Sequence, residues 1–111
     1  MKIVNLTPHE INIIGADNTV ALIVPPSGIV ARATSTRSIF GSVKVDGIDI
    51  PINKTTFGTV ISLPEPAEDT IYVVSNITAQ AVPNRDDVFI VDESVRDENG
   101  RIIGCRSLAH V

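Results

Sequence analysis

Arginine is the residue type in this 111-residue chain that is best suited to bind a ligand. Arg85, Arg96, Arg101 and Arg106 all fall in the last quarter of the sequence, and Asn84 directly precedes the first of them. A guanidinium can donate two parallel N–H bonds to a phosphate, and a carboxamide can hydrogen-bond a base or a ribose. If the protein binds a small anionic nucleotide, the candidate ligand-binding residues are therefore Asn84, Arg85, Arg96 and Arg101.

These arginines have a plainer interpretation as solvated surface. Six of the thirteen acidic residues lie in the same stretch, between Ile71 and Arg106. An exposed pair such as Asp97 with Arg101 contributes at most about 1 kcal/mol to stability. The two interpretations differ in what they predict for the double change of Arg85 and Arg96 to Ala. If these arginines bind a ligand, the double variant should no longer retain the ligand, and its melting temperature should change little.

Neither catalysis nor a metal site is predicted. Cys105 could form a thiolate pair with His9 or His110, but a lone cysteine in a strand-like run usually behaves as a small buried apolar group. The acidic residues 86–93 match neither a calcium loop nor a zinc site, and the scattered glycines form no phosphate loop. No nucleophile, base and orienting group fall into a recognisable arrangement. We therefore expect no catalytic residue, no metal ligand and no cofactor.

The candidate residues lie in a stretch with clear secondary-structure signals. Residues 71–74, Ile-Tyr-Val-Val, are typical of a strand covered on both faces near the middle of a sheet. Ser75 can cap a short helix over residues 76–82, which ends before Pro83. Another short strand is expected at 88–91.

A hairpin turn is expected at residues 97–101. Asn99 and Gly100 tolerate the positive φ that such turns need. A three-residue loop over 98–100 places Val95 opposite Ile103, so that apolar residues pair behind the turn.

The rest of the chain reads as short strands separated by turns. Asp46-Gly47 between two alternating runs is the strongest hairpin signal. About nine short strands and one short helix predict a mainly β fold, an antiparallel β-sandwich or small barrel, built as one domain over residues 1–111. Besides those named above, strands are expected at residues 2–6, 10–14, 19–24, 29–34, 42–52 as a hairpin, and 57–63.

Composition limits the partners that the chain can attract. The net charge is −4, so the surface as a whole does not attract nucleic acid or an anionic membrane. The first residues lack a signal-peptide apolar region, and no apolar run is long enough to span a bilayer, so a cytoplasmic location is expected. Short strands with open edges favour self-association, most often as a symmetric dimer.

Several motifs spread over nearly the whole chain resemble a family of small bacteriophage and prophage proteins. The resemblance implies a setting, the cytoplasm of an infected or lysogenic bacterium, and brings no activity or site residues. The motifs are Asn5-Leu6-Thr7-Pro8-His9, Phe57-Gly58, Leu63-Pro64-Glu65-Pro66, Pro83-Asn84-Arg85-Asp86-Asp87, Val95-Arg96-Asp97 and Ile103-Gly104-Cys105.

In that setting, small proteins without catalytic groups often disable a host defence. We expect a non-enzymatic accessory protein, a homo-oligomer that binds and sequesters a small anionic nucleotide-like ligand. Host immune signals such as the cyclic ADP-ribose isomers of Thoeris defence are ligands of this kind. The alternatives are a minor virion or tail-associated module, and an inhibitor that binds a host protein.

Overall fold

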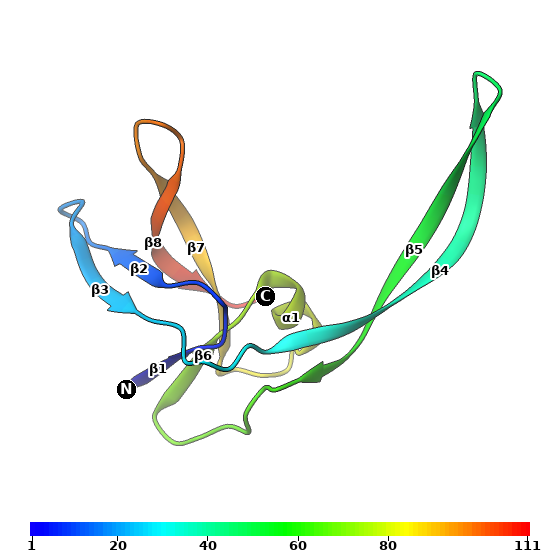
Figure 1. The fold of residues 1–111 in the computed structure, drawn as a ribbon. Coiled ribbons are helices and arrows are strands. Elements are labelled where there is room, and N and C mark those ends of the chain that lie inside the picture. The colour runs from blue at the N-terminus through cyan, green and yellow to red at the C-terminus, as the bar shows by residue number, and fades with distance from the viewer.

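The computed structural model describes residues 1–111 and confirms the mainly β fold with one short helix (Figure 1). Eight strands are present, where about nine were expected. Six of them form one sheet, and the other two form a separate hairpin. The elements are β1 (Lys2–Asn5), β2 (Ile11–Ile14), β3 (Val20–Val24), β4 (Arg32–Val45), β5 (Ile48–Ile61), β6 (Thr70–Val73), α1 (Asn76–Ala81), β7 (Val88–Arg96) and β8 (Ile102–Ala109).

The six-stranded sheet is mixed, although mainly antiparallel pairing was expected. Its order is β1-β6-β7-β8-β2-β3, and the pairs β1–β6, β6–β7 and β2–β8 are parallel. Parallel neighbours cannot be joined by a tight turn and need a crossover connection. Helix α1 lies in the connection from β6 to β7. Strand β1 pairs with β6 although most of the chain separates them in the sequence, and Lys2 lies opposite Thr70.

Strand β6 and the residue that follows it, Val74, place apolar side chains on both faces of the sheet, as the sequence predicted. Tyr72 and Val74 belong to one buried cluster and Val73 to another, because successive side chains of a strand point to opposite faces. The first cluster is completed by Leu6, Ala31, Ala79 and Val88, and the second by Ile11, Val24 and Cys105.

Asn5 joins the two outermost strands of the sheet. Its side chain is almost fully buried, and Nδ2 donates to the carbonyl oxygens of His9 at 2.7 Å and Val24 at 3.1 Å. Its Oδ1 accepts from the backbone N–H and the hydroxyl of Thr7. Val24 ends β3 and Asn5 ends β1, so one carboxamide links both edges. All its hydrogen-bonding capacity is used, which explains a buried polar residue here.

The local predictions around α1 are confirmed. The Ser75 hydroxyl accepts a hydrogen bond from the backbone N–H of Thr78, and the helix ends before Pro83.

The loop between β7 and β8 also closes as expected, with the Asp97 N–H bonded to the Arg101 carbonyl at 2.8 Å. The expected register behind it was wrong. Val95 lies opposite Gly104, because a bulge follows Val95. No helix is long and apolar enough to cross a membrane.

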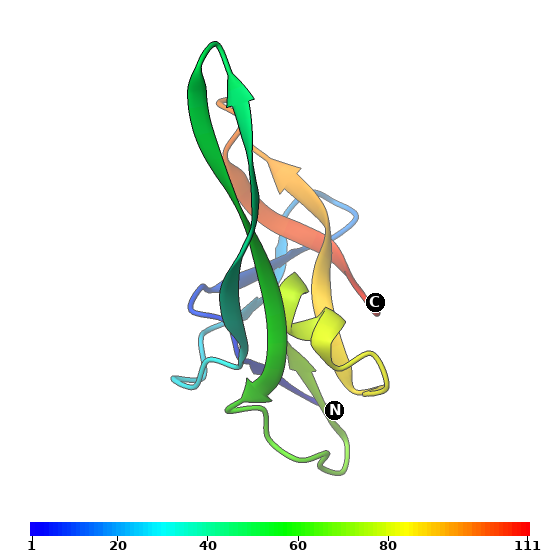
Figure 2. The same cartoon turned by 90° about the vertical axis from the view of Figure 1, so that its right-hand side faces the viewer.

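Strands β4 and β5 are 14 residues each and form a twisted hairpin that projects from the six-stranded sheet (Figures 1 and 2). We call residues 34–58 the arm and the rest of the chain the body. Asp46 and Gly47 form the predicted turn, with φ of 50° and 79°. The radius of gyration is 17.9 Å, whereas a compact domain of this length has about 13 Å.

The polar residues 35–38 continue β4, where the sequence suggested a break between strands. Their backbone groups pair with β5, from Ser35 opposite Phe57 to Ser38 opposite Lys54. Sequence patterns mark strands by their apolar residues, so a polar stretch of a ribbon that lies in solvent gives no such signal.

Candidate functional site

The four residues predicted to bind a ligand do not form one site. Asn84 and Arg85 precede β7, whereas Arg96 ends it. The nine-residue strand spans roughly 26 Å from its first residue to its last, at about 3.3 Å per residue. Arg101 lies close to Arg96, across the β7–β8 loop. The structure therefore places Arg96 and Arg101 at the same loop and separates them from Arg85.

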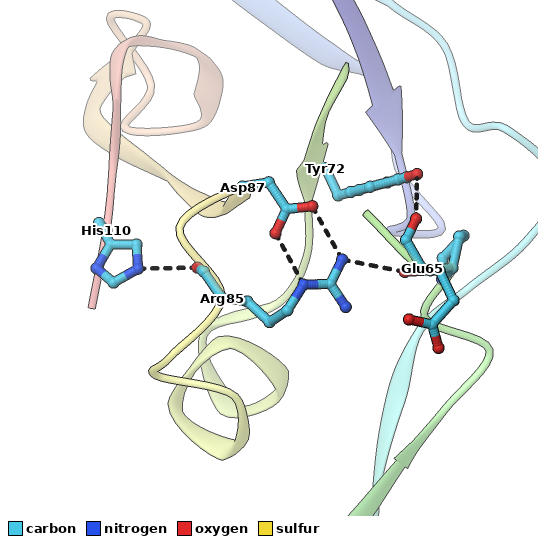
Figure 3. Close-up of polar contacts among 6 residues, drawn as sticks. Glu65, Tyr72, Arg85, Asp87 and His110 are labelled. Carbon is cyan, nitrogen blue, oxygen red and sulfur yellow. Dashed lines mark hydrogen bonds and ion pairs between the residues drawn. The ribbon is translucent and has the colours of Figure 1, made fainter. Parts of the chain in front are cut away.

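Arg85 is held by an internal ion pair (Figure 3). Its Nε and Nη2 bond the two carboxylate oxygens of Asp87 at 2.8 and 2.9 Å, and Nη2 also donates to the Pro64 carbonyl at 3.0 Å. These hydrogen bonds lower the pKa of Asp87 and raise that of Arg85. About four fifths of each side chain is shielded from solvent. The guanidinium fastens the turn before β7 to the segment between β5 and β6.

Neighbouring groups extend this fastening (Figure 3). The Tyr72 hydroxyl donates to the Glu65 carbonyl at 3.1 Å, and Nε2 of His110 lies 3.0 Å from the Arg85 carbonyl oxygen. The His110 ring also meets Phe89 edge-on, with the ring centroids 6.1 Å apart. His110 lies one residue from the end of the chain, and these contacts hold its ring. The cluster as a whole holds the turn before β7 against the chain end and the segment between β5 and β6.

Arg96 and Arg101 are exposed beside the β7–β8 loop. Arg96 donates from Nη1 to the Gly100 carbonyl at 2.7 Å. The Asp97 carboxylate accepts from the backbone N–H groups of Asn99 and Arg101, which shapes the loop. Asn84 is exposed in its own turn.

The largest hollow of the chain lies elsewhere, between the body sheet, the start of α1 and the base of the arm. Its volume is about 1020 Å³, and more than half of its lining residues are hydrophobic. We call it the groove. Its lining includes polar or aromatic side chains from several separate segments, among them Thr7, Asn12, Arg32, Phe57 and Asn76, and one acidic residue, Glu10.

Arg32 supplies the positive charge of the groove. It is exposed at the first position of β4 and takes no part in the three ion pairs of the chain. Phe57 projects from the facing strand, with about half of its surface exposed. A guanidinium binds phosphate, an aromatic ring stacks on a base, and carboxamides such as that of Asn76 hydrogen-bond base edges.

Sequence reasoning named neither Arg32 nor Phe57 as a site residue. A signal for Arg32 was present, because no acidic residue lies between Asp17 and Asp46. An arginine without acids nearby in the sequence lacks the local partner that Arg85 finds in Asp87. Phe57 gave no such signal, since its position over the groove depends on the pairing of β4 with β5.

Cys105 also lines the groove, but it is nearly buried in β8. Burial raises the pKa of its thiol, which favours the protonated and less nucleophilic form. No three His, Cys, Asp or Glu side chains gather in a way that could hold a metal ion. Comparisons with protein-family models, with curated proteins and with solved structures found no match to this chain.

Proposed function

We propose that this protein is a non-enzymatic accessory protein that sequesters a small anionic nucleotide-like ligand, and that the ligand binds in the groove. The proposal rests on one observation. The guanidinium of Arg32, which forms no ion pair, and the exposed aromatic ring of Phe57 line the same groove. Arg32 would bind the phosphate and Phe57 would stack on the base. The volume of about 1020 Å³ suits a ligand of nucleotide size or larger.

Two further points support sequestration. The one thiol at the groove has a raised pKa and is nearly buried, so it is a poor nucleophile. The resemblance of the chain to bacteriophage and prophage proteins supplies a setting in which a nucleotide immune signal of the host is the ligand. Capture without turnover would disable such a signal.

Isothermal titration calorimetry with a panel of nucleotides tests the proposal. The panel contains AMP, ADP-ribose, a cyclic ADP-ribose isomer and a cyclic dinucleotide. At least one should bind with a micromolar or lower Kd and be recovered unchanged. Arg32→Ala should weaken binding about 10- to 150-fold, since a charge-assisted hydrogen bond contributes roughly 1.5–3 kcal/mol.

The matched control is Arg37→Ala. Arg37 lies five residues further along β4, is exposed, and does not line the groove, so its removal changes the net charge equally. This variant should bind as the wild type does. Millimolar or weaker binding of the whole panel, or equal effects of the two changes, would contradict the proposal.

A second candidate, a minor virion or tail-associated module, is favoured by a different observation. The arm projects from the body and exposes large apolar side chains such as Ile39 and Phe40. Virion components are held by protein contacts of this kind. Mass spectrometry of purified particles would detect the chain in stoichiometric amounts if this candidate is right, and would not detect it if the protein acts in the cytoplasm.

A further inference from the structure

The outer half of the arm has one entirely aliphatic face. In its register Val45 lies opposite Ile48, and Val43 lies opposite Ile50. Residues that lie opposite each other in an antiparallel pair share a face, and residues two apart on a strand share it too. The four side chains therefore form one continuous surface, which we call the arm face. Between 44 and 65% of each of the four residues is exposed.

Near the turn, between residues 42 and 51, the reverse side of the hairpin carries the charged and polar side chains. Lys44 lies opposite Asp49, and their charged groups are 4.0 Å apart in an exposed ion pair. Ser42 and Pro51 form the next pair on that side. Alternation of this kind is the mark of a sheet with one face in water and the other covered. Nothing within the chain covers the arm face.

The solvent-accessible surface of the chain is larger than expected for a folded monomer of its mass. It exposes 7667 Å², whereas a folded monomer of 11.9 kDa exposes about 5900 Å². The excess of roughly 1700 Å² is about twice the 800 Å² or so that one partner buries in a standard interface. A lone two-stranded hairpin is also at most marginally stable in water. The arm alone is therefore both highly exposed and marginally stable. These are the properties of an element that needs a permanent partner to cover it.

We propose that the arm face packs against the arm face of a second copy of this chain, related by a two-fold axis. The face is self-complementary, because it consists of Val and Ile alone and brings no like charges together. Permanent homodimer interfaces are more hydrophobic than transient ones, and two-fold dimers are the commonest assemblies. Two hairpins packed in this way form a small four-stranded sandwich.

The distribution of charge supports contact through the arms. Residues 34–58 contain three basic and two acidic residues, a net charge of +1, whereas the body contains six basic and eleven acidic residues, a net charge of −5. Two bodies repel each other at close range. The molecule is 56 Å long, and arms that meet near their tips keep the acidic bodies apart. The groove at the base of each arm stays open, so ligand binding and dimerisation are separable.

Sedimentation equilibrium of the full chain at 1–50 μM tests the inference. The wild type should be a dimer. The arm-face variant, with Val43, Ile48 and Ile50 all changed to Thr, should be a monomer with its dissociation constant raised at least 100-fold. Thr keeps the β-branched shape, so strand propensity is retained. The control variant, Lys44→Thr with Asp49→Thr, changes the reverse side of the same strands and should remain a dimer.

A second measurement guards against unfolding of the variant. The far-ultraviolet circular dichroism and the shielding of the Cys105 thiol should show that the body stays folded. Cross-linking of an Ile50→Cys variant then reports the contact itself, and the introduced thiol should be joined to the arm of the second copy. A monomeric wild type, a dimeric arm-face variant, or cross-links from the arm to the body only would each overturn the proposal. So would a monomer whose arm face is covered by a different protein.

Discussion

Changing Arg85 to Ala should destabilise the fold by about 2–3 kcal/mol. The change removes three hydrogen bonds of 2.8 to 3.0 Å, two of them to the Asp87 carboxylate. Hydrogen bonds to charged groups contribute roughly 1.5–3 kcal/mol each, and partial exposure of the pair to solvent reduces the total. A loss of this size should lower the melting temperature by roughly 10 °C in a chain of 111 residues.

Thermal and urea unfolding followed by circular dichroism would measure the loss. A double-mutant cycle with Asp87→Ala should give a coupling energy above about 1 kcal/mol, because the two side chains bond each other directly. Arg96→Ala is the matched control, since its single hydrogen bond to Gly100 is exposed, and it should change stability by less than about 0.5 kcal/mol. If Arg85→Ala is as stable as the wild type but loses a ligand, Arg85 is a binding residue and the structural interpretation is wrong.

Three further predictions concern the core and its pH dependence. Pairing with Arg85 lowers the pKa of Asp87 in the folded protein. The pair therefore stabilises the protein above the unfolded pKa of about 3.9, and its contribution is lost as the pH falls through the folded pKa. Urea midpoints measured from pH 6 to 2 should fall less in Arg85→Ala than in the wild type. Gly104→Ala should cost about 1–3 kcal/mol, because its Cβ would lie 2.6 Å from the Asn12 carbonyl oxygen, whereas Gly41→Ala meets no atom within 4 Å and should be neutral or slightly stabilising in the same melts. Cys105 should react with Ellman's reagent much more slowly in native protein than in urea, and an equal rate would mean that β8 is open.

Local signals in the sequence were sufficient for the elements whose contacts are local. The Ser75 cap, the end of α1 before Pro83 and the Asp46-Gly47 turn each involve residues within a few positions of one another. The parallel pairing of β1 with β6 was not predictable in this way. No sequence pattern around Lys2 or Thr70 indicates that the two residues pair, because their pairing depends on how all the intervening strands pack.

The candidate site shows the same division. A cluster of arginines near the chain end was visible, but the contact between Arg85 and the Pro64 carbonyl joins segments 21 residues apart, and the length of β7 separates Arg85 from Arg96. Asp87, only two residues from Arg85, was the available clue that this guanidinium is paired. The groove could not be foreseen, because Arg32 and Phe57 come from strands that were expected to be separate short pieces.

The parallel pairing of β1 with β6 also sets the order in which a growing chain can fold on the ribosome. Both strands of the arm are present once Ile61 has been synthesised, and their pairing closes a short loop, which costs little entropy. At that moment β1 has no partner, because Thr70 to Val73 have not yet been made. The body folds last, through contacts distant in sequence, which are the slow ones to form. Nascent chains on one messenger RNA therefore expose both arm strands to each other before either body is finished, so that two arms can stabilise each other during synthesis.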